Sequence, residues 1–229
     1  MTEKNSSSSS HNTQISLLKG MFRSAYKLSL FTFICIVLLL GVYYLTAPQI
    51  EHEQREAMLK TFHKVLPPSL YNNTPLEDTL IINDTKQLAL LGSKEPITIY
   101  RARLDHQPAG VIFQLVARNG YSSHITLLMG VLPNGTVSGV RVLNHRETPG
   151  LGDKIEERKD DWILNFAGRS LQVTTINNQL IANDPRWAVK KDGGEFDQFT
   201  GATITPRAVV AAVKKALLFV HQRGDALYE

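Results

Sequence analysis

A threonine-rich segment with several small residues lies directly before the last apolar-periodic stretch of the sequence. It reads Asp192-Gly-Gly-Glu-Phe-Asp-Gln-Phe-Thr-Gly-Ala-Thr203. The start of a helix carries unpaired backbone N–H groups and a partial positive charge, so it can bind a phosphate group. Gly201 and Ala202 leave space beside the backbone for phosphate oxygens, and hydroxyl groups stand at Thr200, Thr203 and Thr205. The segment indicates a phosphate site, although a capped helix with an ordinary threonine-rich entry has the same composition.

A second segment combines glycine, proline and polar residues between a predicted strand and a predicted helix. It reads His145-Arg-Glu-Thr-Pro-Gly-Leu-Gly-Asp153. Gly150 and Gly152 permit backbone conformations that are closed to other residues, and they permit close approach to a flat ligand. A plain turn rich in Gly and Pro has the same pattern.

A hydrolase that uses Glu147, Asp153 and His145 is a competing hypothesis for the second segment. The sequence contains no nucleophile elbow, zinc motif or other recognised catalytic arrangement to support it. We therefore predict no catalytic residue and no metal ligand.

Composition restricts the function further. The net charge is +4, and residues 1–47 contribute +3 of it, because four cations there face Glu3 alone. The rest of the chain is close to neutral, whereas a nucleic-acid binder needs a basic face on its folded domain. Cys35 is the single cysteine, so neither an intrachain disulfide nor a cysteine-ligated iron–sulfur cluster is possible. If this protein carries electrons, an organic cofactor must hold them.

An uncharged apolar run, Leu28–Ala47, predicts a membrane helix. About 20 residues span roughly 30 Å of hydrocarbon. A cleaved signal peptide is the alternative, but the exit Leu45-Thr-Ala47 is followed by Pro48 and makes a poor cleavage site. The basic residues before the run favour a cytoplasmic N-terminus. We expect a disordered cytoplasmic tail over residues 1–20, an anchor over 21–47 and a periplasmic domain over 48–229.

The elements of the exported domain follow from periodicity and turn signals. Residues 50–66 predict a helix with Met58, Phe62, Val65 and Leu66 on its apolar side. Short strand-like runs separated by turns then predict an antiparallel meander over residues 97–104, 110–118, 123–132 and 136–143.

The second half of the domain has a different pattern. Residues 153–166 suit a helix that buries Ile155, Trp162, Ile163 and Phe166, and a short strand is expected at 187–190. The closing helix is predicted from Pro206 to Arg223, with Thr205 as N-cap and Gly224 at its C-terminal end. Strands followed by helices indicate an α+β domain.

Taken together, the two polar segments resemble the FMN-binding domain family. The resemblance rests on Thr200-Gly-Ala-Thr203, on the upstream Asp197 and on the loop Glu147-Thr-Pro-Gly-Leu-Gly152. Within that family the chain is similar to the G subunits of the bacterial Rnf (Rsx) electron-transport complexes. The C subunits of the sodium-translocating NADH:quinone reductases are more distant relatives. The similarity covers nearly all of residues 20–224.

The resemblance implies that FMN is joined through its phosphate to Thr203 by a phosphoester bond. It implies a separate flavin transferase, which makes this bond from FAD with Mg²⁺ and recognises the segment containing Asp197, Thr200, Gly201 and Ala202. The flavin ring is expected beside the other loop, at Glu147, Thr148, Gly150, Leu151 and Gly152.

For function, the resemblance implies an electron-transfer subunit that works with the other subunits of an Rnf (Rsx) complex in the bacterial inner membrane. Ion movement would belong to partner subunits, because one span cannot form a pathway across the bilayer. A membrane-anchored flavin-binding or sensor module without electron transfer is the alternative, and residue spacing does not separate the two.

Overall fold

The computed structural model describes residues 6–177 and 179–228, with the backbone alone described for residues 6–20 and Ser24. The chain divides into two compact units, Met1–Ala57 and Met58–Glu229. Helix α1 (Ser6–Val65) begins in the first unit, and its last residues belong to the second. Residues 1–5, the start of the tail expected to be disordered, lie outside the described residues.

Helix α1 contains the apolar run. Among the described residues, one helical stretch, Met21–Val65, is long and apolar enough to cross a membrane by length and composition. The hydroxyls of Thr32 and Thr46 donate to the carbonyls of Leu28 and Val42, both at 2.9 Å, so these polar groups are satisfied within the helix. The helix already includes residues from Ser6 onward, where a disordered tail was expected. Extending an existing helix avoids the cost of nucleation, and serine opposes it only weakly.

The second unit is built on an antiparallel sheet of five strands in the order β1-β2-β3-β4-β5. The strands are β1 (Thr79–Ile82), β2 (Ile97–Leu104), β3 (Gln107–Ala117), β4 (Ile125–Val131) and β5 (Val137–Asn144). The predicted four-stranded meander is confirmed as β2–β5. Sequence analysis missed β1 and the short helix α2 (Thr85–Leu90), because elements of four and six residues are too short to show a period.

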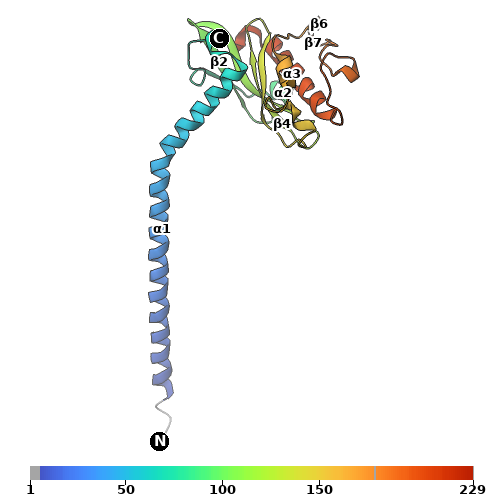
Figure 1. The fold of residues 1–229 in the computed structure, drawn as a ribbon. Coiled ribbons are helices and arrows are strands. Elements are labelled where there is room, and N and C mark those ends of the chain that lie inside the picture. The colour runs from blue at the N-terminus through green and yellow to red at the C-terminus, as the bar shows by residue number, and fades with distance from the viewer. Residues whose placement is uncertain (1–5, 178, 229) are drawn as a thin grey trace. The chain divides into compact units, whose positions relative to one another are not determined.

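Both faces of the sheet are covered, and strand alternation separates two apolar clusters. Helix α3 (Ile204–Arg223) packs on one face of the sheet (Figure 1). The ring centroids of Phe113 and Phe219 lie 5.9 Å apart there. On the other face, Phe62, Val65 and Leu66 from the end of α1 pack against residues of β2, β3 and β4. The predicted apolar side of residues 50–66 is thus confirmed. An α+β domain is also confirmed.

Two glycines let the end of α1 approach the sheet closely. A Cβ atom on Gly130 would lie 2.4 Å from the Val65 carbonyl oxygen, and one on Gly139 would lie 3.0 Å from Val65 Cα. The contact at Gly130 leaves no room for a side chain, and the contact at Gly139 is tighter than ordinary van der Waals packing. The backbone of residues 64–65 therefore rests directly on β4 and β5.

The prediction of one helix over 153–166 is wrong, but the prediction of its buried residues is confirmed. The structure has two separate 3₁₀ turns, η2 (Gly152–Ile155) and η3 (Asp161–Phe166). The backbone is extended at Glu156, and the Asp160 side chain caps η3 by accepting from Trp162 N–H at 2.9 Å. All four residues predicted to be buried are buried: Ile155, Trp162, Ile163 and Phe166.

The segment before α3 also differs from expectation. A hairpin of β6 (Thr174–Ile176) and β7 (Gln179–Ile181) was missed. The strand predicted at 187–190 is reduced to one bridge, between Val189 and Phe196. The turn η4 (Lys190–Asp192) and Gly193, with φ +86°, reverse the chain there and stop the pairing.

Helix α3 begins two residues earlier than predicted. Its N-cap is Thr203 rather than Thr205, and Thr205 is the second helical residue. The predicted cap was wrong because the Thr205 hydroxyl has a tertiary partner, described below. At the other end Gly224 is the C-cap, as predicted, with φ +52°. Short 3₁₀ turns η1 (Pro68–Leu70) and η5 (Gly224–Leu227) complete the unit.

Candidate functional site

Three segments that are distant in the sequence converge on one pocket of about 300 Å³. That volume is at the lower end of the range for small-molecule sites. The segments are the β3–β4 loop, the loop after β5 and the start of α3. The lining residues are Tyr121, Glu147, Thr148, Leu151, Gly152, Gly201, Ala202, Thr203, Ile204 and Thr205.

The entry to α3 is a tight turn followed directly by the helix N-terminus. The Ala202 N–H donates to the Phe199 carbonyl at 3.1 Å, and Gly201 has φ +80°. That backbone conformation at the third position of a turn favours glycine strongly. Thr203 follows as N-cap, half-buried, and its hydroxyl makes no capping hydrogen bond. The first-turn N–H groups of a helix have no partner within it, so this end attracts an anion.

Glu147 lines the pocket and is 4% exposed. Its carboxylate accepts hydrogen bonds from Ser122 N–H at 3.0 Å, Tyr121 N–H at 3.3 Å and the Thr205 hydroxyl at 2.5 Å. These donors come from the β3–β4 loop and from the first turn of α3. One buried side chain thus joins all three segments of the pocket.

His145 holds the backbone of the same loop. Its Nδ1 accepts from the Glu147 N–H at 3.0 Å, so the ring proton sits on Nε2 and is donated to Glu156 at 2.9 Å. Hydrogen bonds from His145 and then Arg158 lower the pKa of the Glu156 carboxyl. Both ring nitrogens of His145 therefore make hydrogen bonds within the protein, and neither is left to act on a substrate. This disfavours the hydrolase hypothesis.

An aromatic cluster supports the turn before α3. The rings of Trp162, Phe166, Trp187, Phe196 and Phe199 pack together, with Phe166 stacked on Phe196 at 4.6 Å. Trp162 Nε1 donates to the carbonyl of Asp197 at 2.7 Å. The position of the threonine-rich segment is thus set by the core and by a buried indole hydrogen bond.

Seven of the ten predicted site residues line this one pocket, and the other three do not. Thr200 and Gly150 are exposed, and Gly150 has φ +78° with open space around it. Asp197 points its carboxylate outward, where it pairs with Lys190 at 2.6 Å. Asp197 is therefore exposed and is not part of the pocket wall.

Sequence reasoning missed two pocket residues, Tyr121 and Ile204. Their side chains are 68% and 46% exposed, and Leu151 beside them is 42% exposed. Large apolar side chains exposed around a pocket indicate a surface for a ligand or partner. The available signal was Gly120, directly before Tyr121. A Cβ at Gly120 would lie 2.1 Å from the Ser123 carbonyl oxygen and 2.9 Å from Glu147 Oε1.

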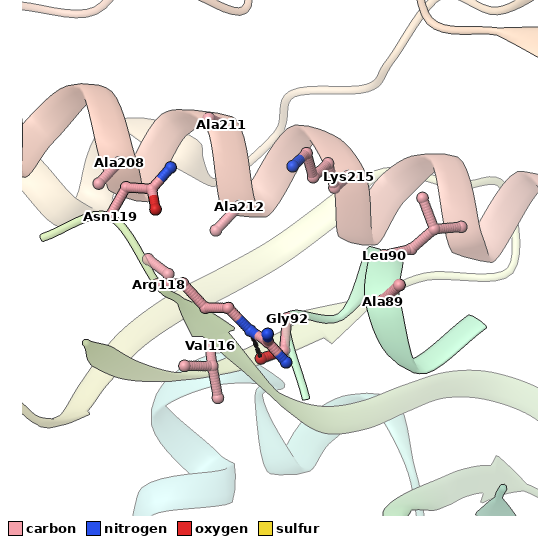
Figure 2. Close-up of a pocket in the computed structure, with 11 residues that line it drawn as sticks. Ala89, Leu90, Gly92, Val116, Arg118, Asn119, Ala208, Ala211, Ala212 and Lys215 are labelled. Atoms are coloured by element: carbon pink, nitrogen blue, oxygen red, sulfur yellow. Dashed lines mark hydrogen bonds between the residues drawn. The ribbon is translucent and has the colours of Figure 1, made fainter. Parts of the chain in front are cut away.

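A second hollow, next to α3, differs from the first pocket in its volume and in the residues that line it. Figure 2 shows it between α3, α2 and the end of β3, with Ala208, Ala211 and Ala212 along the helix. It measures about 140 Å³, and Arg118 in it donates to the Gly92 carbonyl at 2.7 Å. It is about half the volume of the first pocket, and none of the predicted site residues lines it.

Comparison with known proteins identifies the domain to which this pocket belongs. Residues 120–218 match the family model of the FMN-binding domain, and residues 14–65 match that of the RnfG N-terminal region. The sheet, the pocket at a helix start and this match define the second unit as a domain of the FMN-binding class.

Relatives along the whole chain specify the family. The chain is 42% identical over 212 residues to the G subunit of the ion-translocating oxidoreductase complex of Vibrio cholerae serotype O1, covering 93% of the chain and 96% of that protein. It is 44% identical over 203 residues to the G subunit of Pseudoalteromonas atlantica, covering 88% of each. It is 40% identical over 209 residues to that of Shewanella loihica, covering 91% and 93%. The chain belongs to the family of G subunits of ion-translocating oxidoreductase complexes.

Proposed function

We propose that this chain is a membrane-anchored electron-transfer subunit of an ion-translocating oxidoreductase complex, with FMN joined by a phosphoester bond to Thr203. The observation that carries the proposal is the position of Thr203. It stands at the start of α3 beside a positive-φ glycine, on the wall of the pocket, with a hydroxyl that is not used as a helix cap.

The residues present fit an FMN group. The N-terminus of α3 favours the negative charge of a phosphate, and Gly201 and Ala202 add little bulk beside it. Tyr121, Leu151 and Ile204 supply exposed apolar surface suited to one face or edge of a flat ring. FMN would supply one- and two-electron transfer, while the protein supplies position and electrostatics.

Attachment requires a second protein. In the transfer from FAD, the Thr203 oxygen forms a bond to the phosphorus of the FMN half, the pyrophosphate bond breaks, AMP leaves and the hydroxyl proton is released. Such a flavin transferase needs access to the threonine-rich turn. The outward Asp197 and the exposed Thr200 are suitable contacts for it.

Replacing Thr203 tests the proposal directly. Thr203→Ala should leave a folded, membrane-bound protein without covalent flavin, whereas Thr174→Ala, at an exposed threonine of β6 outside the pocket, should still be labelled. Both variants are expressed with the transferase and compared by in-gel flavin fluorescence after denaturing electrophoresis and by intact mass. Full flavin fluorescence in Thr203→Ala would refute the assignment.

We also propose that the anchor is retained in the bacterial inner membrane and that the second unit faces the periplasm. The apolar stretch of α1 and the basic residues before it support this orientation. Protease added to spheroplasts should digest the domain from Ile50 onward, while a cytoplasmic marker protein stays intact. Complete protection of the domain in the same spheroplasts would show the opposite orientation.

A further inference from the structure

Glu147 is the one charged residue among those that line the pocket, and it is buried. Both carboxylate oxygens already accept hydrogen bonds from the protein: Oε1 from Ser122 N–H, and Oε2 from Tyr121 N–H and the Thr205 hydroxyl. A carboxylate that is satisfied in this way is directed toward the walls of the pocket rather than toward its contents. Its partners are 25, 26 and 58 residues away along the chain.

Two glycines make room for this carboxylate. A Cβ on Gly152 would lie 2.9 Å from Glu147 Cβ, Glu147 Oε2 and Thr205 Oγ1. A Cβ on Gly120 would also lie 2.9 Å from Glu147 Oε1. Gly152 does not have a positive φ, so a glycine is needed there for the space it leaves and not for its backbone conformation. Side chains at these two positions would therefore collide with Glu147.

We infer that Glu147 is a positioning residue for flavin attachment: its carboxylate fixes the first turn of α3 and the β3–β4 loop, and so presents the Thr203 hydroxyl to the incoming phosphate. This inference rests on the proposed attachment of FMN to Thr203. Thr205 is two residues beyond Thr203 in the same helical turn. A hydrogen bond that holds Thr205 therefore limits the movement of Thr203 as well.

The role requires a carboxylate and is not met by an amide. A glutamine has one accepting oxygen and one NH₂ group in place of two accepting oxygens. If the NH₂ replaces Oε1 it faces the Ser122 N–H, and if it replaces Oε2 it faces the Tyr121 N–H. Either orientation leaves a backbone donor unpaired in a buried place, which loosens one wall of the pocket.

The test uses the full-length protein in detergent, with purified transferase, FAD and Mg²⁺, and measures the initial rate of in-gel flavin fluorescence. Glu147→Gln is compared with Glu157→Gln, a control whose carboxylate is paired with Lys64 and Arg141 outside the pocket. Thr205→Val removes the hydroxyl at constant shape, and Thr205→Ser keeps it. Amide hydrogen exchange is followed at Tyr121 and Ser122.

Glu147→Gln should lower the initial labelling rate by about tenfold or more, because a charge-assisted hydrogen bond is lost. Thr205→Val should lower it by a smaller factor, while Thr205→Ser and Glu157→Gln label normally. Exchange at Tyr121 and Ser122 should speed up in Glu147→Gln, with the amides of β3 and β4 unchanged. This combination separates positioning from a general loss of stability.

Labelling of folded Glu147→Gln at the wild-type rate would overturn the inference. So would a loss of labelling that only follows a lowered melting temperature across all the variants. If Glu147→Gln does not fold, Thr205→Val decides: slow labelling of the folded protein supports the inference, and a normal rate overturns it. Failure of the proposed function is recognised separately, because then either the wild type would stay unlabelled or Thr203→Ala would be labelled.

Discussion

Asp184 anchors the chain segment that leads to the threonine-rich turn, and its removal should destabilise the domain in a pH-dependent way. It is 1% exposed and accepts four hydrogen bonds, from Gln172 N–H and from the backbone, Nε and Nη2 of Arg186 at 2.8–3.2 Å. Its carbonyl accepts from Lys214 of α3 at 3.2 Å. An Asp184→Asn variant keeps the size and loses the charge.

The magnitude follows from the pKa of this carboxyl. The Arg186 side chain first, and then the backbone donors, lower the pKa of Asp184 from 3.8 to about 2. A difference of 1.8 units (3.8 minus 2) corresponds to about 2.4 kcal/mol, and the partial exposure of Arg186 reduces the expected effect to about 2 kcal/mol. For a domain of this size, that lowers the melting temperature by about 4–8 °C.

The sign of the pH dependence is fixed by the direction of the shift. Because the folded pKa is below the unfolded one, the stabilisation by Asp184 is fully present above pH 3.8 and is lost as pH falls toward 2. The wild type and Asp184→Asn should therefore differ in melting temperature at pH 7 and converge at low pH. Trp187, three residues away and buried, provides the fluorescence signal for unfolding.

Asp192→Asn is the matched control, because that exposed carboxylate is also paired with an arginine, Arg207 at 2.6 Å. An exposed pair contributes little, so its melting temperature should stay near that of the wild type. Two results would refute the reasoning about Asp184: an unchanged melting temperature in Asp184→Asn at pH 7, or a difference that stays constant down to pH 2.5.

Two further predictions concern the sheet and the exposed carboxylate. Gly130→Ala should lower the free energy of unfolding by about 1–3 kcal/mol, and the melting temperature with it, because its Cβ would lie 2.4 Å from the Val65 carbonyl oxygen. A thermal melt like that of the wild type would contradict this packing. Asp197→Ala should reduce flavin labelling by the transferase. Its thermal melt should stay unchanged, since Asp197 is exposed and its ion pair with Lys190 lies at the surface. Normal labelling would show that Asp197 has no part in flavin attachment.

Several parts of the domain could be predicted because their signal is local. The apolar run of α1 needs only length and the absence of charge, and β2–β5 show short apolar runs between turn residues. The end of α3 at Gly224 follows from the conformation that glycine adopts easily. The segments around Glu147 and Thr203 were identified from their residue types, and both do reach one pocket.

The remaining features depend on contacts between distant residues, which no window of sequence contains. The N-cap of α3 is Thr203 and not the predicted Thr205, because the Thr205 hydroxyl donates a hydrogen bond to Glu147, 58 residues earlier in the chain. The predicted helix over 153–166 became two 3₁₀ turns because Glu156 and Asp160 find partners that interrupt it. The sequence by itself determined the long apolar helix, the meander and the residue types of the site. Only the tertiary structure decided which of these residues meet. The reason is that buried hydrogen bonds and close packing between distant segments contribute more free energy than the local propensities of the residues involved.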